Sequence, residues 1–338
     1  MRVFVTGGTG LVGGHTIRQL RSRGDEVVAL ARSDAAAAAL EALGASVLRG
    51  DSGDAAALER GVAAGDATVH AAAMVMGRAG FEAYHAANVI PTESVAAACA
   101  RHGKRLVYLS SVAVYGRRDT YAGGRGSVTE DFGLDRPPYE GDYYARSKRD
   151  AELALWRVVE ATGLRAAALR PCVIYGEGDR QFAPRLARAL RLTRGVAPLI
   201  GGGRTLLSVV YAGNVAAAVL AALDHAAAAG PFNVANDGGI TVRAFFERLA
   251  AGLGLRLVPV SIPEALARAG ARAVDAAFGA LRPRGPMAML RGTVEFLGRD
   301  NPYTSERAAR VLGWRPAVAP EEAAELTGRA FRPPRRGS

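Results

Sequence analysis

Lysine is almost absent from this chain of 338 residues, in which arginine supplies nearly all of the positive charge. The two lysines are Lys104 and Lys148. Cysteine is equally rare, and Cys99 and Cys172 are too few for a disulfide framework or a cysteine-based metal site. The histidines show no ligand-like spacing. We therefore expect a protein of a reducing compartment, the cytoplasm, that holds no metal.

Long hydrophobic runs and a clustered charge are also missing. No apolar stretch reaches the roughly 20 residues that a membrane-spanning helix needs, and Met1 leads directly into a strand pattern, so we expect no signal peptide. The net charge of +11 comes from scattered arginines, without the aromatic-plus-basic pattern of nucleic-acid binders. We expect no nucleic-acid partner, although a positive surface would attract an anionic cofactor.

A glycine-rich turn between a strand and a helix opens the chain, with the sequence Thr6-Gly-Gly-Thr-Gly-Leu-Val-Gly13. In such a unit Gly7 allows a tight turn, Gly10 lets the backbone approach a pyrophosphate, and Gly13 lets the helix pack on the strand. The N–H groups at the helix start attract an anion. Glycine-rich turns also occur as plain loops, but this strand–helix context favours phosphate binding.

Strand and helix patterns alternate through the first half of the chain, and glycines at 24, 44, 103 and 163 end four helices. Repeated units of this kind with buried apolar strands predict an α/β fold, a Rossmann-type doubly wound parallel sheet. The expected strands are 2–6, 26–31, 45–48, 67–72, 104–109 and 165–170, and the expected helices are 11–23, 34–43, 54–61, 82–102 and 142–162.

The alternation breaks after residue 175, where glycine-rich loops and later proline-rich breaks appear. We predict a dinucleotide-binding domain and a smaller, interleaved, partly helical C-terminal lobe for the substrate. The first comprises 1–175, with 206–235 returning to it. The second comprises 176–205 and 236–330, followed by a basic tail at 331–338.

Hydroxyl and basic side chains follow in an order that suits catalysis. Ser110 and Ser111 follow the strand at 104–109, at the sheet edge where ligands bind in open α/β sheets. Tyr144 and Lys148 are four residues apart, so they share one helix face. A lysine beside a phenol lowers the pKa of the tyrosine, which suits a general acid/base. Such pairs are common on surfaces, but the scarcity of lysine indicates a role that a guanidinium cannot fill.

Together these segments resemble an extended short-chain dehydrogenase/reductase of the NAD-dependent epimerase/dehydratase superfamily, closest to the 3β-hydroxysteroid dehydrogenase-like group. The matching motifs are the glycine turn, Ser110-Ser-x-x-Val-Tyr-Gly116, Tyr144-x-x-x-Lys148 and Arg170-Pro-Cys-Val-Ile-Tyr-Gly176, and the likeness continues into 304–316.

The resemblance implies a role for each motif residue. Ser111 is the catalytic serine, Tyr144 the acid/base, and Lys148 the residue that binds the nicotinamide ribose and tunes Tyr144. Asn88 supports the active-site water and the lysine, although it also reads as an ordinary polar helix residue. The implied cofactor-binding residues are Gly7, Thr9, Gly10, Leu11, Val12, Gly13, Arg32, Asp51, Ser52, Ala71, Ala72, Ala73, Tyr144, Lys148, Pro171 and Val173.

The end of the second strand bears on the choice of cofactor. An acidic residue there would bond the ribose 2′-OH of NAD, but the chain has Ala31 followed by Arg32. An arginine can bind a 2′-phosphate through charge-assisted hydrogen bonds. NADP(H) is therefore favoured. NAD(H) stays an alternative, in which Arg32 would simply be solvated. The resemblance places Asp51 at the adenine amino group.

The substrate is suggested by what the epimerase-type motifs lack. No asparagine follows Arg170, and Arg204 alone makes a weak diphosphate clamp. Tyr211-Ala-Gly-Asn-Val215 resembles the 3β-hydroxysteroid dehydrogenase subgroup. We expect an oxidoreductase that interconverts a secondary alcohol and a ketone on a small apolar substrate, such as a steroid. The alternatives are a nucleotide-sugar epimerase or dehydratase with tightly bound NAD, and a non-catalytic NADP-binding regulator, which the intact Ser–Tyr–Lys set disfavours.

Two features concern further contacts. The apolar run at 261–300 reads as an amphipathic helix on the core, as a cover for an apolar substrate, or as a membrane-surface patch, although no anchor is present. The resemblance also implies a homodimer that pairs two helices per subunit, including the Tyr–Lys helix, whose residues 151–160 carry apolar surface.

Overall fold

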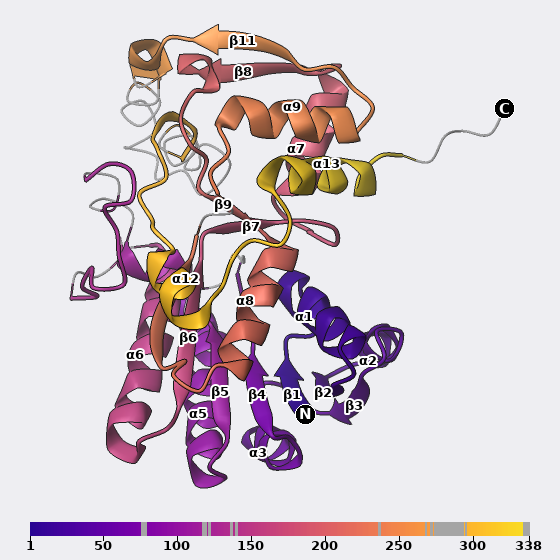
Figure 1. The fold of residues 1–338 in the computed structure, drawn as a ribbon, viewed down its shortest axis with the longest axis vertical. Coiled ribbons are helices and arrows are strands. Elements are labelled where there is room, and N and C mark those ends of the chain that lie inside the picture. The colour runs from indigo at the N-terminus through magenta and orange to yellow at the C-terminus, as the bar shows by residue number, and fades with distance from the viewer. Residues whose placement is uncertain are drawn as a thin grey trace, which may run out of the picture.

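A seven-stranded parallel sheet forms the centre of the computed structural model (Figure 1). The structure describes residues 1–75, 80–116, 120, 123–135, 138, 141–235, 238–267, 269–270, 273, 294 and 296–333. The strand order is β10-β6-β5-β4-β1-β2-β3, and every pairing is parallel. The strands are β1 Arg2–Thr6, β2 Glu26–Ala31, β3 Ser46–Arg49, β4 Ala67–His70, β5 Arg105–Leu109, β6 Ala166–Pro171 and β10 Gly230–Val234.

Helices cover both faces of this sheet, because the strands are apolar on both sides. Val3 and Val5 of β1 belong to one core cluster and Phe4 belongs to the other. The first cluster is completed by α1 Leu11–Ser22, α2 Asp34–Glu41 and α8 Ala212–Asp224. The second is completed by α3 Ala55–Ala64, α5 Ile90–Arg101 and α6 Tyr143–Thr162. The predicted doubly wound fold is therefore confirmed.

A second group of elements lies beyond the carboxyl ends of the strands and has its own apolar cluster (Figure 1). Two small parallel sheets belong to it, β7 Val173–Tyr175 with β9 Val209–Tyr211, and β8 Val196–Ile200 with β11 Val258–Ile262. The helices are α7 Ala183–Leu192, α9 Val242–Gly252 and α13 Pro320–Ala330. Another helix, α12 Glu306–Leu312, packs near β10. The division of the chain into two domains stays a prediction.

The local predictions are correct in most places. The predicted strands differ from the observed ones by no more than two residues at either end. Gly24, Gly44, Gly103 and Gly163 all adopt positive φ angles, between 62° and 87°, as helix-ending glycines do. Within the described part of the chain, none of the helices combines the length and apolar character that crossing a bilayer requires.

The helix predicted over 82–102 differs, because the structure divides it. A short helix, α4 Phe81–Tyr84, is followed by a π-helical turn at His85–Val89 and then by α5. A π-turn places one extra residue in the helical ladder and is frequent at functional sites. Asn88 lies in this turn, where its side chain points to a neighbouring chain segment rather than to solvent.

The C-terminal segment is fixed to α8 through one buried amide. Asn214 at the start of α8 accepts hydrogen bonds from the N–H groups of Ala317 (3.0 Å) and Val318 (3.1 Å). Its own NH₂ donates to the Val318 carbonyl at 2.8 Å. Aspartate could not make that last donation, so asparagine at this position has a structural reason in this chain.

Candidate active site

The glycine turn between β1 and α1 lies against the segment that follows β4. Gly7 has φ 71°, and a Cβ atom there would lie 2.5 Å from the Ala72 nitrogen. A Cβ atom on Gly13 would lie 2.2 Å from the Gly7 carbonyl oxygen. Only glycine fits at both places. The turn is closed by the Gly10 N–H, which donates to the Gly7 carbonyl at 2.9 Å.

The start of α1 has the properties of a pyrophosphate site. The residue that caps the helix is Gly10, which has no side chain to bond the first N–H groups. The first turn carries no acidic residue. Thr9 and Gly10 are exposed and Leu11 is half-buried, whereas Val12 and Gly13 are buried against the core. This turn therefore offers backbone N–H groups to an anion, and the residues present fit a dinucleotide there.

Residues 71–73 continue the same surface. The Ala71 N–H donates to the Thr6 carbonyl at 3.2 Å, and the Ala72 N–H donates to the Thr6 hydroxyl at 3.3 Å. All three alanines are half-buried. Because their side chains are small, a ligand on the glycine turn could lie against this backbone, as the sequence predicts.

The ends of β2 and β3 carry an exposed ion pair. Ala31 is buried, and Arg32 is 80% exposed with its guanidinium 3.8 Å from the Asp51 carboxylate. The other Asp51 oxygen accepts from the Gly53 N–H at 2.9 Å, which fixes the loop containing the half-buried Ser52. Arg32 and Asp51 thus lie together at the sheet edge, as the cofactor predictions require, and a cation rather than a carboxylate follows β2.

Ser111 lies at the carboxyl end of β5 and begins a short 3₁₀ turn, Val112–Tyr115. Its hydroxyl oxygen accepts from the Ala113 N–H at 3.1 Å, which fixes the rotamer of the side chain. The side chain is half-buried. Since the hydroxyl also carries a hydrogen, Ser111 can donate to a substrate oxygen while its acceptor function is used by the turn.

Lys148 is buried in α6 and its ammonium is directed to the end of β5. The ammonium donates to the Leu109 carbonyl at 2.7 Å and to the Tyr108 hydroxyl at 3.4 Å. Leu109 is two residues before Ser111, so the lysine and the serine are held at the same strand end. Burial lowers the pKa of Lys148 to about 7, while Glu152 acts in the opposite direction. Tyr144 lies one helical turn before Lys148 and is half-buried.

Asn88 connects the segment after β4 to the helix that carries Tyr144 and Lys148. Its Oδ1 accepts from the Met74 N–H at 2.7 Å, and its Nδ2 donates to the Met74 carbonyl (3.0 Å) and to the Ser147 hydroxyl (2.8 Å). Ser147 in turn donates to the Tyr144 carbonyl at 2.9 Å. Asn88 therefore ties three predicted site segments together, and its implied role toward water and lysine stays a prediction.

Pro171 and Val173 lie on either side of the step from β6 to β7. Pro171 is the buried last residue of β6, and Val173 begins β7 with 37% of its surface exposed. They lie at the same sheet edge as Ser111, because parallel strands end together. Their predicted contact with the cofactor stays a prediction.

The structure also contains a buried polar cluster that the sequence analysis missed. His70 ends β4, stacks on Tyr108 at 5.7 Å, and contacts Thr6 (2.7 Å) and Thr92 (3.2 Å). The Thr92 hydroxyl donates to the Asn88 carbonyl, so it accepts from His70 Nε2–H, and Nδ1 then accepts from Thr6. Burial, together with the Lys148 charge, lowers the pKa of His70 to about 3. The only sign of this cluster in the sequence is that polar residues, Thr6 and His70, end two short apolar strands.

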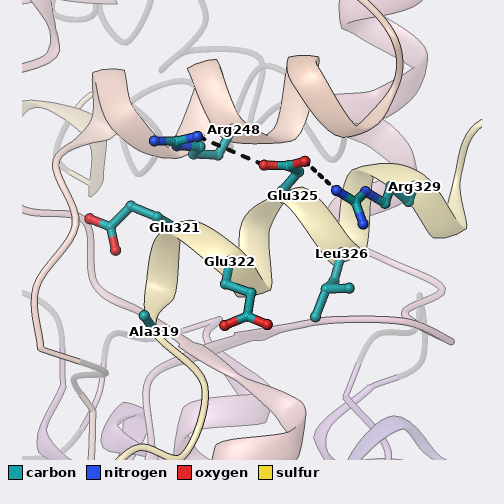
Figure 2. Close-up of a pocket in the computed structure, with 7 residues that line it drawn as sticks. All are labelled: Arg248, Ala319, Glu321, Glu322, Glu325, Leu326 and Arg329. Carbon is teal, nitrogen blue, oxygen red and sulfur yellow. Dashed lines mark hydrogen bonds and ion pairs between the residues drawn. The ribbon is translucent and has the colours of Figure 1, made fainter.

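A surface pocket of about 370 Å³ lies away from these residues, between α9 and α13 (Figure 2). Glu325 of α13 contacts Arg248 of α9 at 3.8 Å, and Arg329 one turn along α13 at 2.6 Å. None of the predicted site residues lines this pocket. No group of three or more potential metal ligands occurs among the residues that the structure describes.

Comparison with known proteins is consistent with this arrangement. The family model described as "NAD dependent epimerase/dehydratase family" matches residues 3–235. A 4-hydroxy-2-methyl-3-oxo-4-farnesyl-3,4-dihydroquinoline-1-oxide ketoreductase of Stigmatella aurantiaca is 33% identical, covering 93% of this chain and 92% of that protein. A 2-alkyl-3-oxoalkanoate reductase of Stenotrophomonas maltophilia is 34% identical, covering 95% and 97%.

More distant relatives and solved structures extend the comparison. A 3beta-hydroxysteroid-dehydrogenase/decarboxylase of Arabidopsis thaliana is 28% identical, covering 73% of this chain and 58% of that protein. The structure of a Thermus thermophilus UDP-glucose 4-epimerase in complex with NAD aligns with a TM-score of 0.69 and 25% identity, covering 98% of this chain and 99% of that one.

Proposed function

Because this chain belongs to the NAD dependent epimerase/dehydratase family, we propose that it reduces a ketone on a hydrophobic, chain-bearing substrate to a secondary alcohol, with NADPH as the preferred cofactor. The family resemblance predicted from the motifs is confirmed. The relatives are reductases and dehydrogenases that act on hydroxyl or keto groups, and the chain is an NAD(P)-dependent oxidoreductase of this kind.

The observation that carries the proposal is the placement of Lys148. A buried ammonium is bonded to the end of β5, two residues before Ser111, and Tyr144 is one turn away on the same helix. A reduction needs a hydride at the carbonyl carbon and a proton at the carbonyl oxygen, and this arrangement suits the second requirement.

Each side chain has a distinct task in this scheme. When bound, a reduced nicotinamide would supply the hydride. Ser111 donates a hydrogen bond to the substrate oxygen, which develops negative charge as the carbonyl is reduced. Tyr144 gives its phenolic proton to that oxygen. The Lys148 ammonium stabilises the resulting phenolate and so lowers the free-energy barrier for proton transfer.

The substrate class is proposed from the two relatives with the highest identity among those described above. Both are named for reduction of an oxo group on a molecule that also carries an alkyl or farnesyl chain. Epimerisation is less favoured, because the segment that follows Arg170 lacks the asparagine that epimerase-type enzymes usually carry there. A homodimer formed through α6 and its neighbour α5 is part of the same proposal.

A substrate screen tests the reaction directly. We expect the purified protein to consume NADPH with 2-alkyl-3-oxoalkanoates that carry long chains, and to act at least about tenfold less well on short-chain analogues, because each buried CH₂ contributes about 0.8 kcal/mol. Nicotinamide absorbance measures the rate, with steroid ketones and UDP-sugars tested in parallel. Stoichiometric NAD retained through purification, together with stabilisation by UDP-sugars, would instead favour the epimerase.

The cofactor preference is tested at Arg32. In the Arg32→Asp variant we expect the affinity for NADPH relative to NADH to fall by about 10- to 100-fold, since hydrogen bonds between charged groups contribute about 1.5–3 kcal/mol. Fluorescence titration of both nucleotides measures the ratio. The control is Arg157→Asp, which makes the same charge change at an exposed position of α6. Equal ratios in the two variants would show that Arg32 is merely solvated.

A further inference from the structure

A buried carboxylate lies one helical turn beyond Lys148 in the same helix. Glu152 has no exposed surface, although it is a charged side chain. It accepts hydrogen bonds from the Arg170 Nε at 3.0 and 3.2 Å, from a second Arg170 nitrogen, from the Ser110 hydroxyl, and from the Trp156 indole at 3.1 Å. This is a fully bonded ion pair, which is the condition under which a protein tolerates such burial.

The bonds of this pair reach the strand that carries the predicted catalytic serine. Ser110, which donates to Glu152, directly precedes Ser111. Arg170 on β6 also donates to the Tyr115 hydroxyl at 2.6 Å, and Tyr115 donates to the Asn233 side chain on β10 at 2.8 Å. The carboxylate therefore fixes α6 relative to the carboxyl ends of three strands.

Glu152 is also the negative charge that faces Lys148. Among the described residues, Tyr108 on β5 and His70 on β4 also lie near that ammonium, Tyr144 lies one turn earlier on α6, and Arg170 on β6 is paired with Glu152. Burial raises the pKa of Tyr108 and lowers that of His70, so both are neutral near pH 7. Burial also disfavours the charge on Lys148, and Glu152 opposes this effect.

We propose that Glu152 is a positioning residue for this active site: its buried carboxylate is the counter-charge one helical turn from the Lys148 ammonium, and it holds the end of β5 that leads to Ser111 against the Tyr144 helix, with Arg170 fixing the carboxylate. The expected effect of Glu152 on turnover rests on the proposed reductase function. Its effect on the charge of Lys148 does not, and can be measured without a substrate.

The scarcity of lysine makes that measurement simple. Protein labelled with ¹³C-lysine has two lysine signals, from Lys104 and Lys148, and the Lys104→Arg background leaves one. In this background we expect Glu152→Gln to lower the NMR-measured pKa of Lys148 by about one unit or more, because an opposite charge nearby favours the charged form. Glu152→Asp keeps the charge, so the pKa of Lys148 in this variant should lie close to its native value. Glu160→Gln, at an exposed position on the same helix, should leave the pKa of Lys148 unchanged.

Turnover provides the second readout. In Glu152→Gln the alkaline limit of kcat for ketone reduction should move to lower pH by the same amount as the lysine titration. A structural role alone would lower kcat without moving the pH profile. If the pKa of Lys148 falls as expected but neither the native chain nor any variant reduces a ketone, the proposed function fails. The electrostatic role of Glu152 then still stands.

The unpaired Arg170 could prevent the Glu152→Gln variant from folding. The double variant Glu152→Gln/Arg170→Met removes both charges and avoids that problem, since a buried ion pair can often be replaced by neutral side chains. It should also lower the pKa of Lys148, but by less, because removing the Arg170 charge acts in the opposite direction. An unchanged lysine titration in whichever of these variants folds, judged by its circular dichroism, would overturn the proposal.

Discussion

Replacing Tyr144 with phenylalanine should reduce ketone turnover by about 10³-fold while leaving NADPH affinity within about twofold of the native value, because proton transfer by a positioned side chain contributes 10²–10⁴-fold. The substitution removes one hydroxyl group from a half-buried ring on α6 and leaves the helix intact. Single-turnover kinetics and a nucleotide titration on the same sample separate the chemical step from binding.

The adjacent tyrosine gives a matched control. Tyr143 is 38% exposed, and its ring lies 6.2 Å from Phe81 and 6.4 Å from Tyr84. Tyr143→Phe makes the same chemical change one residue away, so we expect nearly native turnover. Retained turnover in Tyr144→Phe would exclude the assigned acid/base role, and equal losses in both variants would point to an effect of the substitution on packing at the start of α6.

The predictable features of this site are those whose physical cause is local. The glycine turn could be predicted because its conformation needs glycine at fixed spacings within eight residues, and the structure confirms the close contacts at Gly7 and Gly13. The helix position shared by Tyr144 and Lys148 follows from helical periodicity alone. A parallel sheet also places the ends of β2, β5 and β6 at one edge, which is why residues far apart in the sequence could be assigned to one site.

The features that could not be predicted depend on contacts between distant segments. Nothing near Asn88 indicates a π-turn, which occurs where the asparagine bonds Met74 and Ser147. Likewise, Glu152 reads in the sequence as an ordinary helix residue, and only the approach of Arg170 from β6 explains its burial. A charged residue in the core can be identified only when its partner is known. Arg170 lies 18 residues after Glu152, and no sequence spacing indicates that the two are paired.

The part of the site that would contact the substrate does not follow from sequence motifs in the same way. The apolar run at 261–300 was predicted to pack on the core as an amphipathic helix, to cover an apolar substrate or to form a membrane-surface patch. Its residues 268, 271–272, 274–293 and 295 lie outside the described part of the chain. In the described part, Leu266 is 64% exposed. The proposed substrate class therefore rests on the relatives and on the catalytic groups rather than on a pocket lined by known side chains.

A methyl group at Gly13 should have the second large effect. In Gly13→Ala the new Cβ atom would lie 2.2 Å from the Gly7 carbonyl oxygen and 2.8 Å from the Gly8 Cα. Both are backbone atoms of the turn, so the contact cannot be relieved by rotating a side chain, and the turn or the helix must move. We expect NADPH affinity to fall by at least about 100-fold, because a pyrophosphate site made of backbone N–H groups depends on the position of those groups.

Gly14→Ala tests whether this effect comes from the close contact or from losing a glycine. Gly14 is the next residue of α1 and is also buried, but its added Cβ atom would lie 3.6 Å from the Gly8 carbonyl, an ordinary van der Waals distance. Alanine is favoured over glycine inside a helix by about 0.5–1 kcal/mol, so this variant should bind NADPH normally and melt at an equal or higher temperature. Melting curves without nucleotide separate binding from folding in Gly13→Ala. If both variants bind NADPH as the native chain does, the turn does not hold the cofactor, and the dinucleotide site has to be sought elsewhere along the sheet edge.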